Sequence, residues 1–141
     1  MMNFGLSFVL LSLAACMAFN ANAADEKAPG AERFFEMRTY YAAAGKMDAM
    51  HARFRDHTNK LFVKHGMQLI GYWVPCEGTG TSNTMVYILA YPSKEARDKA
   101  WKAFVADPDW VKAKSESEVN GKLVDKVDIV YLKPTDYSPI K

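Results

Sequence analysis

The stretch RFFEMRTYY, residues 33–41, sets the first element of the fold, because its side chains alternate along an aromatic-rich run. Such alternation is typical of a β-strand, whose successive side chains point to opposite faces of a sheet. One side carries Phe35, Met37, Thr39 and Tyr41, and the other carries Phe34, Glu36, Arg38 and Tyr40. Large side chains occupy both sides, and a folded domain is expected to begin at about residue 33.

A long helix is predicted after this strand, beyond a connection at Gly45. Apolar residues and one histidine recur at spacings of three, four or seven, which places them on one helix face. They are Met47, Met50, Phe54, Leu61 and His65. Gly66 follows them directly, and glycine is the usual residue just past a helix end. The helix is therefore expected to end at Gly66.

Two more strands are predicted from QLIGYWVPC, residues 68–76, and NTMVYILAY, residues 83–91. Both runs are rich in apolar, β-branched and aromatic side chains. The intervening segment EGTGTS, residues 77–82, is longer than a tight two-residue turn. The two runs therefore predict a hairpin with an extended loop.

A second helical region is predicted from residue 93 onward. Ser93 is expected to cap the helix, and Trp101, Phe104 and Val105 form its apolar stripe. Asp107 and Pro108 then favour a restart, since an aspartate caps free amides and proline suits a first helical turn. Trp110 is expected to fold back on the core.

The last element, KLVDKVDIVYLKP at residues 122–134, alternates as a strand and ends at Pro134. The predicted order is therefore βαββαβ. This order is that of an α+β, ferredoxin-like fold, a four-stranded antiparallel sheet with two helices on one face.

The sheet face away from the helices predicts a homodimer. Val127, Ile129 and Tyr131 are expected beneath the helices. The opposite face would then carry Lys126, Asp128 and Val130 of the last strand and Glu36, Arg38 and Tyr40 of the first. So many large side chains beside opposite charges favour burial against a second sheet. An ordinary solvated face is the alternative.

The N-terminus has the features of an export signal. The segment 3–19 is apolar and free of side-chain charge, and the small-x-small triplet 21–23 suits cleavage before Ala24. Residues 1–23 are therefore predicted to be a signal peptide and residues 24–32 a linker, with export to a bacterial periplasm or secretion. The alternative is a lipoprotein acylated at Cys16, because Leu13–Cys16 resembles a lipobox. After the N-terminus the sequence contains no other apolar run long enough to cross a membrane, so no membrane span is predicted.

Composition excludes some partners. The 18 basic and 16 acidic residues are nearly balanced and form no basic block, so no nucleic-acid partner is expected. After either cleavage the one unmodified thiol is Cys76, and no internal disulfide is possible. The glycines of residues 78–82 lack the lysine and following helix of a phosphate cradle, and no cofactor is expected.

The sequence resembles the NIPSNAP family of the dimeric α/β-barrel superfamily over residues 33–139. The resemblance rests on Glu36-x-Arg38-x-Tyr40, the helix end from His57 to Gly66, Gly71-x-Trp73, Arg97 with Trp101, Asp107-Pro108-x-Trp110 and Tyr137-Ser138-Pro139. It implies a ferredoxin-like protomer whose sheet pairs with a second copy, and an activity that is largely undefined. Familiar eukaryotic members are mitochondrial, whereas this chain carries an export signal.

The three histidines lie within one predicted helix, at His51, His57 and His65. His57 and His65 would be ~12 Å apart along the axis, too far to chelate one ion, so no metal site is expected. His57 follows Phe54 by three and is expected to face the sheet, either buried and neutral or as a general acid/base. His65 suits the negative end of the helix.

Aromatic residues on the central strands mark the predicted ligand site. Trp73, Tyr72 and Tyr87 could line an apolar cleft between sheet and helices, or simply be core. Arg38 could hold a carboxylate or only its neighbour Glu36. The predicted ligand-binding residues are Arg38, Tyr40, His57, Trp73 and Tyr87.

Three functions remain open. The first is an exported homodimeric barrel that binds a small apolar or aromatic molecule. The second is a cofactor-independent, monooxygenase-like enzyme with His57 as its acid/base. The third is a ligand-free interaction protein. The sequence contains no motif that fixes a reaction.

Overall fold

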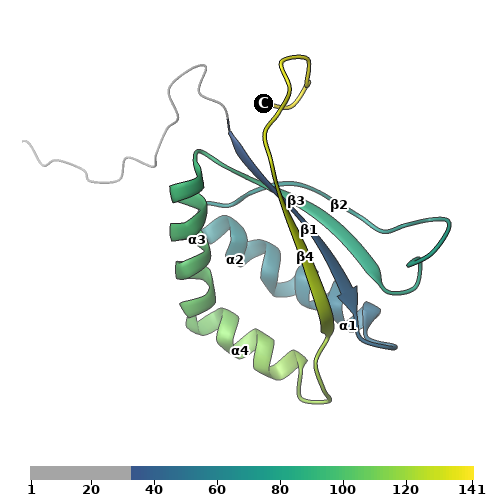
Figure 1. Ribbon diagram of the computed structural model, residues 1–141. Helices are drawn as coiled ribbons and strands as arrows, with labels where there is room; N and C mark the ends of the chain where they lie inside the picture. The colour runs from purple at the N-terminus through teal and green to yellow at the C-terminus, as the bar shows by residue number, and fades with distance from the viewer. Residues whose placement is uncertain (1–32) are drawn as a thin grey trace, which may run out of the picture.

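Four antiparallel strands form one sheet in the order β2-β3-β1-β4 (Figure 1). The computed structural model describes residues 33–141. The elements are β1 (Phe34–Ala42), α1 (Met47–Arg53), the π-helix η1 (Phe54–Thr58), α2 (Asn59–Lys64), β2 (Gln68–Trp73), β3 (Thr84–Tyr91), α3 (Lys94–Ala106), α4 (Pro108–Ser117) and β4 (Val124–Leu132). The predicted α+β, ferredoxin-like fold is confirmed. The predicted signal peptide, linker and acylated Cys16 lie outside the described residues.

The predicted helix boundaries are confirmed at three ends. Gly66 follows α2 at a φ of 77°, in the left-handed region that glycine tolerates. The Ser93 side chain accepts a hydrogen bond from the Ala96 amide at 3.1 Å and caps α3. Asp107 caps α4 through the Asp109 amide at 2.9 Å, with Pro108 in the first turn.

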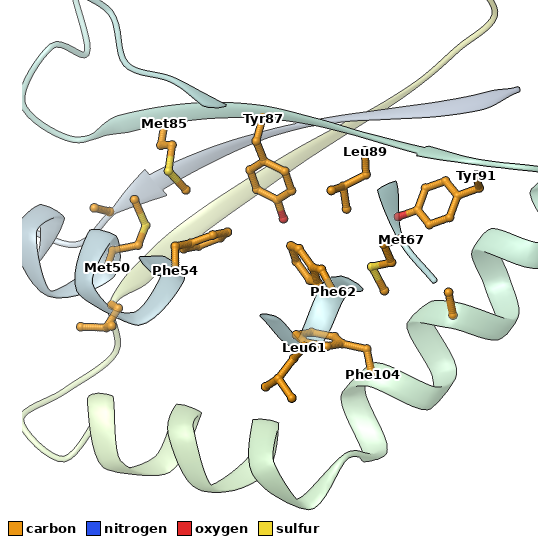
Figure 2. Packing of buried hydrophobic residues seen from close by; sticks show 13 residues of the cluster. Met50, Phe54, Leu61, Phe62, Met67, Met85, Tyr87, Leu89, Tyr91 and Phe104 are labelled. Atoms are coloured by element: carbon orange, nitrogen blue, oxygen red, sulfur yellow. The ribbon is translucent and has the colours of Figure 1, made fainter. Parts of the chain in front are cut away.

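The core lies between the sheet and the helices, which cover one face of the sheet (Figure 2). β3 contributes Met85, Tyr87 and Leu89, each at most 2% exposed. From the helices, Phe62 and Phe104 pack against this layer with ring centroids 4.8 Å apart. The inward side chains of the sheet and the apolar side chains of the helices therefore pack together in one aromatic-rich core.

The long helix contains a π turn, η1, in which Thr58 is buried at 1% exposure while His57 is exposed. Positions 57 and 58 lie three and four residues after Phe54, and both spacings are neighbours on a helix face. The prediction that His57 faces the sheet was therefore wrong, because the fold buries the second of these two positions.

Glu36, Arg38 and Tyr40 lie on the helix side of the sheet, contrary to the predicted outward orientation. Directly opposite residues in an antiparallel pair share a face. Glu36 pairs with Leu89, and Leu89 is fully buried in the core. Glu36 and Arg38 are 0% and 8% exposed, respectively. Charged residues can occupy this inner face because they pair with one another there.

The outer face of the sheet is consequently more apolar than predicted. Met37 of β1 lies between Ile88 of β3 and Val130 of β4 in the register. Met37 and Ile88 are half-buried, and Val130 is 45% exposed. The helices of residues 33–141 lie on the other side of the sheet (Figure 2), so these three residues form an apolar strip across β3, β1 and β4.

The prediction that Val127, Ile129 and Tyr131 lie on the helix side of β4 is confirmed, but the helices cover this face only in part. Val127, Ile129 and Tyr131 share the face of Tyr40, Arg38 and Glu36 through the β1–β4 register. Their exposed fractions are 36%, 44% and 49%. β4 is an edge strand, and the helices leave its inner face open. Val105 of the predicted α3 stripe is also exposed, at 53%.

No helix among residues 33–141 has the length and apolar character needed to cross a bilayer. Cys76 is exposed as a free thiol in the segment between β2 and β3.

Candidate functional site

A cleft of about 410 Å³ lies between β4 and the helices, beside the exposed inner face of that strand. Every helical segment and two strands contribute to its wall. The lining residues are Tyr40, Arg53, Phe54, Thr58, Phe62, Trp101, Phe104, Val105, Trp110, Lys114, Glu118, Lys122, Val124, Asp125, Lys126 and Val127. We refer to this hollow as the β4 cleft.

Aromatic rings form the floor of the β4 cleft. Phe104 is the centre of the group, with ring centroids 4.5 Å from Trp110 and 5.5 Å from Trp101. Phe62 packs 5.4 Å from Trp101. Phe62 and Phe104 are almost fully buried, whereas Trp101 and Trp110 are half-buried. The two tryptophans therefore combine a fixed position with an accessible ring surface.

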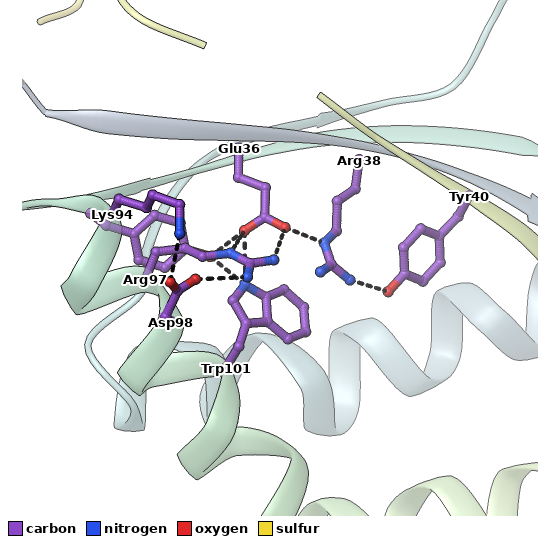
Figure 3. A network of polar contacts seen from close by, with 8 residues as sticks. Glu36, Arg38, Tyr40, Lys94, Arg97, Asp98 and Trp101 are labelled. Atoms are coloured by element: carbon purple, nitrogen blue, oxygen red, sulfur yellow. Dashed lines mark hydrogen bonds and ion pairs between the residues drawn. The ribbon is translucent and has the colours of Figure 1, made fainter. Parts of the chain in front are cut away.

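One end of the cleft adjoins a buried charged cluster built on Glu36 (Figure 3). The Glu36 carboxylate accepts hydrogen bonds from Arg97 at 2.7 and 2.9 Å, through Nη2 and Nε. It also accepts from Arg38 Nε at 2.7 Å, from Trp101 Nε1 at 2.8 Å and from the Tyr91 hydroxyl at 3.1 Å. One carboxylate thus links β1, β3 and α3.

The electrostatics of this cluster favour an ionised Glu36. Burial by itself would raise the pKa of Glu36, but the hydrogen bonds from Arg97 and Arg38 outweigh burial, and its pKa is lowered. Arg38 and Arg97 share this carboxylate, and Arg97 also pairs with Asp98 at 3.1 Å.

Arg38 connects this cluster to the cleft. Its guanidinium lies over the Trp101 ring, 3.6 Å from the centroid, which is a close cation–π contact. Arg38 Nη1 also donates to the Tyr40 hydroxyl at 3.5 Å. Trp101 and Tyr40 both line the β4 cleft, so the position of each is fixed by a buried charge.

Three tyrosines continue from the cleft beneath the sheet. The Tyr87 ring lies 5.2 Å from Tyr40 and stacks on Tyr72 at 5.3 Å. The hydroxyls of Tyr72 and Tyr87 are buried and make no hydrogen bond of ordinary geometry. Burial raises the pKa of both, with a smaller contribution from nearby Tyr40. Both hydroxyls therefore stay protonated at neutral pH.

Arg53 is a second buried cation, and it lines the β4 cleft itself. Its Nη1 donates to Glu118 Oε1 at 2.8 Å and to the Ser117 hydroxyl at 3.4 Å. The residue is only 5% exposed, and its Nε is buried without a hydrogen-bond partner. The guanidinium also lies 5.3 Å from the Trp110 ring centroid.

Three of the predicted ligand-binding residues come together and two do not. Arg38, Tyr40 and Tyr87 form one group beneath the sheet. His57 lies on the exposed side of η1 and lines two other hollows, of about 380 and 320 Å³, together with residues of α4. Trp73 points to the outer side of the edge strand β2 and is 52% exposed. It lines a separate hollow of about 360 Å³ that also includes Tyr72.

Trp73 covers Gly71, which explains the glycine at that position. A Cβ at Gly71 would lie 2.6 Å from the Trp73 ring. The indole can therefore lie flat against the strand only when residue 71 has no side chain.

Sequence reasoning did not identify Arg53 as a site residue, and it treated Arg97 with Trp101 only as part of a family resemblance. The signal for Arg53 is weak, because charged residues surround it in a helix of mixed composition. Its burial depends on Glu118, which is 65 residues away in the chain. Arg97 and Trp101 are four residues apart and share a helix face, a spacing that sequence reasoning could have used.

His65 has a structural role at the junction of α3 and α4. Its Nε2 lies 2.6 Å from Asp107 Oδ2, and Lys64 Nζ lies 2.8 Å from the same oxygen. The pKa of Asp107 is held well below its usual value, first by Lys64 and then by His65. The predicted terminal position of His65 is confirmed, and the contact ties α2 to the α4 cap.

Comparison with known families identifies the relatives of this fold. The sequence profile of the NIPSNAP family matches residues 35–139. The chain belongs to the NIPSNAP family. This NIPSNAP chain matches a NIPSNAP family protein of unknown function from Agrobacterium tumefaciens with 25% identity and a TM-score of 0.67, over 79% of this chain and 96% of that one.

A second NIPSNAP structure from A. tumefaciens is 24% identical, with a TM-score of 0.68, and covers 77% of this NIPSNAP chain and 99% of its own. SnoaB, a cofactor-independent oxygenase from Streptomyces nogalater, is 12% identical with a TM-score of 0.53 over 77% and 99% of the two chains. These two likenesses establish a shared fold. A comparison with curated proteins found no match.

Within residues 33–141, no three His, Cys, Asp or Glu side chains are grouped so as to hold a metal ion.

Proposed function

We propose that this NIPSNAP chain is exported, pairs as a homodimer through the outer face of its sheet, and binds a small aromatic molecule in the β4 cleft. The observation that carries the proposal is the cleft itself, which has half-buried tryptophan rings as its floor and a buried arginine in its wall. Export rests on the predicted signal peptide, and dimerisation rests on the apolar outer face.

The size and lining of the β4 cleft suit a small ring compound. A volume of about 410 Å³ lies in the range of small-molecule sites, which are mostly apolar with a few placed polar groups. Trp101 and Trp110 offer ring faces for offset or edge-to-face contact. The Tyr40 hydroxyl and Arg53 supply the polar groups. Flat aromatic ligands use both kinds of contact.

The homodimer is proposed from the outer sheet face. Met37, Val86 and Ile88 are only half-buried although they lie on the two central strands. An apolar strip of this kind is more stable when it is removed from water. A second copy provides a matching surface, since a two-fold interface places the same patch on both partners. The helix-side β4 cleft stays outside this interface.

Export is proposed with two alternative mature forms, one cleaved before Ala24 and one acylated at Cys16. The intact mass of the protein recovered from its native compartment distinguishes them, because only the second form carries lipid.

The geometry favours binding over chemistry that uses His57. A general base must lie within hydrogen-bond reach of the group it deprotonates. His57 lies on the solvent side of the helices and is not among the residues that line the β4 cleft. The cofactor-independent oxygenase in the comparison shares the fold with this chain, and a fold by itself does not transfer a reaction.

The cleft proposal is tested with the neutral fluorescent probe N-phenyl-1-naphthylamine. Val127 lines the cleft, and a Val127→Trp substitution would fill it. We expect this variant to bind the probe at least about tenfold more weakly than wild type, since the ring site is occupied. Val119→Trp is the matched control, because Val119 is 79% exposed and lies outside the cleft lining.

Equal probe affinity for wild type and the Val127 variant, at retained near-UV circular dichroism, would reject the β4 cleft as the binding site. The cleft is rejected in the same way if the wild-type protein does not bind the probe at all.

A further inference from the structure

We infer that the ligand of the β4 cleft is an aromatic acid, whose ring stacks near Trp110 and whose anionic group accepts a hydrogen bond from Arg53. The inference rests on the proposed function and adds the chemical class of the ligand. It starts from the one buried guanidinium nitrogen that lacks an acceptor within the described part of the chain.

Arg53 is charged at every accessible pH, and a buried charge is costly unless it is paired and hydrogen-bonded. The residue is only 5% exposed, yet its hydrogen bonds to the side chains of Glu118 and Ser117 both leave from Nη1. Nε is buried and unsatisfied in a residue that lines the cleft. Arg53 therefore lies in the wall of the cleft with hydrogen-bonding capacity that its protein partners leave unused.

Glu118 does not use the full capacity of this guanidinium. A carboxylate can bind arginine through two parallel hydrogen bonds, whereas Glu118 contacts Nη1 alone, at 2.8 Å. The Glu118 side chain is 23% exposed, so part of its interaction is with water. Glu118 therefore leaves part of the hydrogen-bonding capacity of the Arg53 guanidinium unused.

The charge around the cleft supports an anionic ligand. Four cationic residues line it against two acidic ones, Glu118 and Asp125. The cations are Arg53, Lys114, Lys122 and Lys126. Lys122 pairs with Asp125 at 2.9 Å, Lys126 with Asp128 at 2.9 Å and Arg53 with Glu118 at 2.8 Å, so Lys114 gives the lining its excess of positive charge.

The neighbouring ring defines the rest of the ligand. The Trp110 centroid lies 5.3 Å from the Arg53 guanidinium carbon. This separation places an aromatic surface and a hydrogen-bond donor side by side. A ligand whose acidic group is attached directly to, or one bond away from, an aromatic ring can reach both.

The test compares two probes that share one scaffold and differ in charge: 1-anilinonaphthalene-8-sulfonate, which is an anion, and neutral N-phenyl-1-naphthylamine. Fluorescence titration gives the ratio of their affinities. We expect wild type to prefer the anion by about tenfold or more, and the uncharged Arg53→Met variant to lose this preference, measured as the ratio of the two affinities.

Glu118→Gln is the second variant, and it does not require the loss of a buried cation. The amide oxygen can still accept from Arg53, but the competing negative charge is gone. We expect a larger preference for the anionic probe. Val127→Trp, which fills the cleft, should weaken the binding of both probes.

The outcomes separate the two proposals. If Val127→Trp leaves the affinity for both probes unchanged, the proposed function fails. If both probes bind in the cleft but wild type shows no preference for the anion, the function stands and the inference fails. The inference is also overturned if Arg53→Met folds and keeps the wild-type ratio, or if Glu118→Gln leaves the ratio unchanged.

Discussion

At the scale of the residue, Glu36 has the most demanding environment in the described chain. It is fully buried, and its carboxylate receives hydrogen bonds from two arginines, a tryptophan and a tyrosine. Such a group stabilises the fold only while the network is complete, because removal of one partner leaves an uncompensated buried charge. The cluster therefore acts as one unit that joins α3 to the sheet.

We expect Glu36→Gln to reduce the free energy of unfolding by about 3–5 kcal/mol at neutral pH, because the buried Arg38 then loses its paired carboxylate, while Arg97 keeps its contact with Asp98. Urea unfolding followed by circular dichroism measures the change. Glu116→Gln is the matched control: this glutamate is exposed and forms a long ion pair at 3.9 Å, so it should shift stability by less than about 0.5 kcal/mol.

The same variant carries a pH signature. The folded-state pKa of Glu36 is lowered from its usual 4.5, so its contribution is present above that value and is lost as pH falls through the folded pKa. The stability gap between wild type and Glu36→Gln should therefore narrow when urea titrations move from pH 7 to pH 3. A constant gap would show that Glu36 is not held ionised by its arginines.

At the scale of the element, the long helix contains a π turn, η1, in which Thr58 is buried and His57 is exposed. The Thr58 hydroxyl donates to the Arg53 carbonyl at 3.2 Å. Arg53, directly before this turn, and Phe54 and Thr58 within it line the β4 cleft.

A charge scan tests which of His57 and Thr58 faces the core. We expect His57→Glu to change the free energy of unfolding by less than about 0.5 kcal/mol, because the position is exposed. Thr58→Glu should cost about 3 kcal/mol or more, because it buries an unpaired carboxylate. Thermal and urea unfolding measure both. The reverse order of the two variants would show that His57, and not Thr58, faces the core.

At the scale of the whole molecule, the two sheet faces have different tasks. The helix side contains the core, the charged cluster and the β4 cleft (Figures 2 and 3). The outer side carries an apolar strip that includes Met37 and Ile88. A ligand site and a dimer contact can therefore coexist in one protomer without competing for the same surface.

We expect wild type to sediment as a dimer at micromolar concentration, and Met37→Lys to sediment as a monomer. A lysine at the centre of the strip would place a charge in a desolvated contact. Sedimentation velocity measures the change, with circular dichroism to show that the variant is folded. Val119→Lys is the control, because Val119 is 79% exposed beside the helices. Monomeric wild type would reject the dimer.

Much of the fold follows from local pattern. The strands, the helix caps at Ser93 and Asp107 and the Gly66 helix end depend on side-chain period and on hydrogen bonds within a few residues. These interactions are the same wherever the segment lies in the molecule. Sequence reasoning therefore predicted the element order and, from it, the ferredoxin-like fold.

The candidate site was predicted only in part. Tyr40 was named as a ligand-binding residue and does line the β4 cleft, and Arg38 and Tyr87 lie next to it. Trp73 was placed on the wrong side of its strand, and His57 on the wrong side of its helix. Arg53 was not named, because its partner Glu118 comes from a distant helix end.

The sequence by itself determined which side chains share a face, since alternation along a strand and recurrence along a helix are properties of the backbone. Only the tertiary structure decided which of two faces turned inward. On β1 both faces carry large side chains, and the charged one became buried because Arg97 and Trp101 of α3 supply partners for Glu36. A partner 61 residues away cannot be inferred from the spacing of neighbouring side chains. That partner nevertheless determines whether Glu36 is buried or exposed.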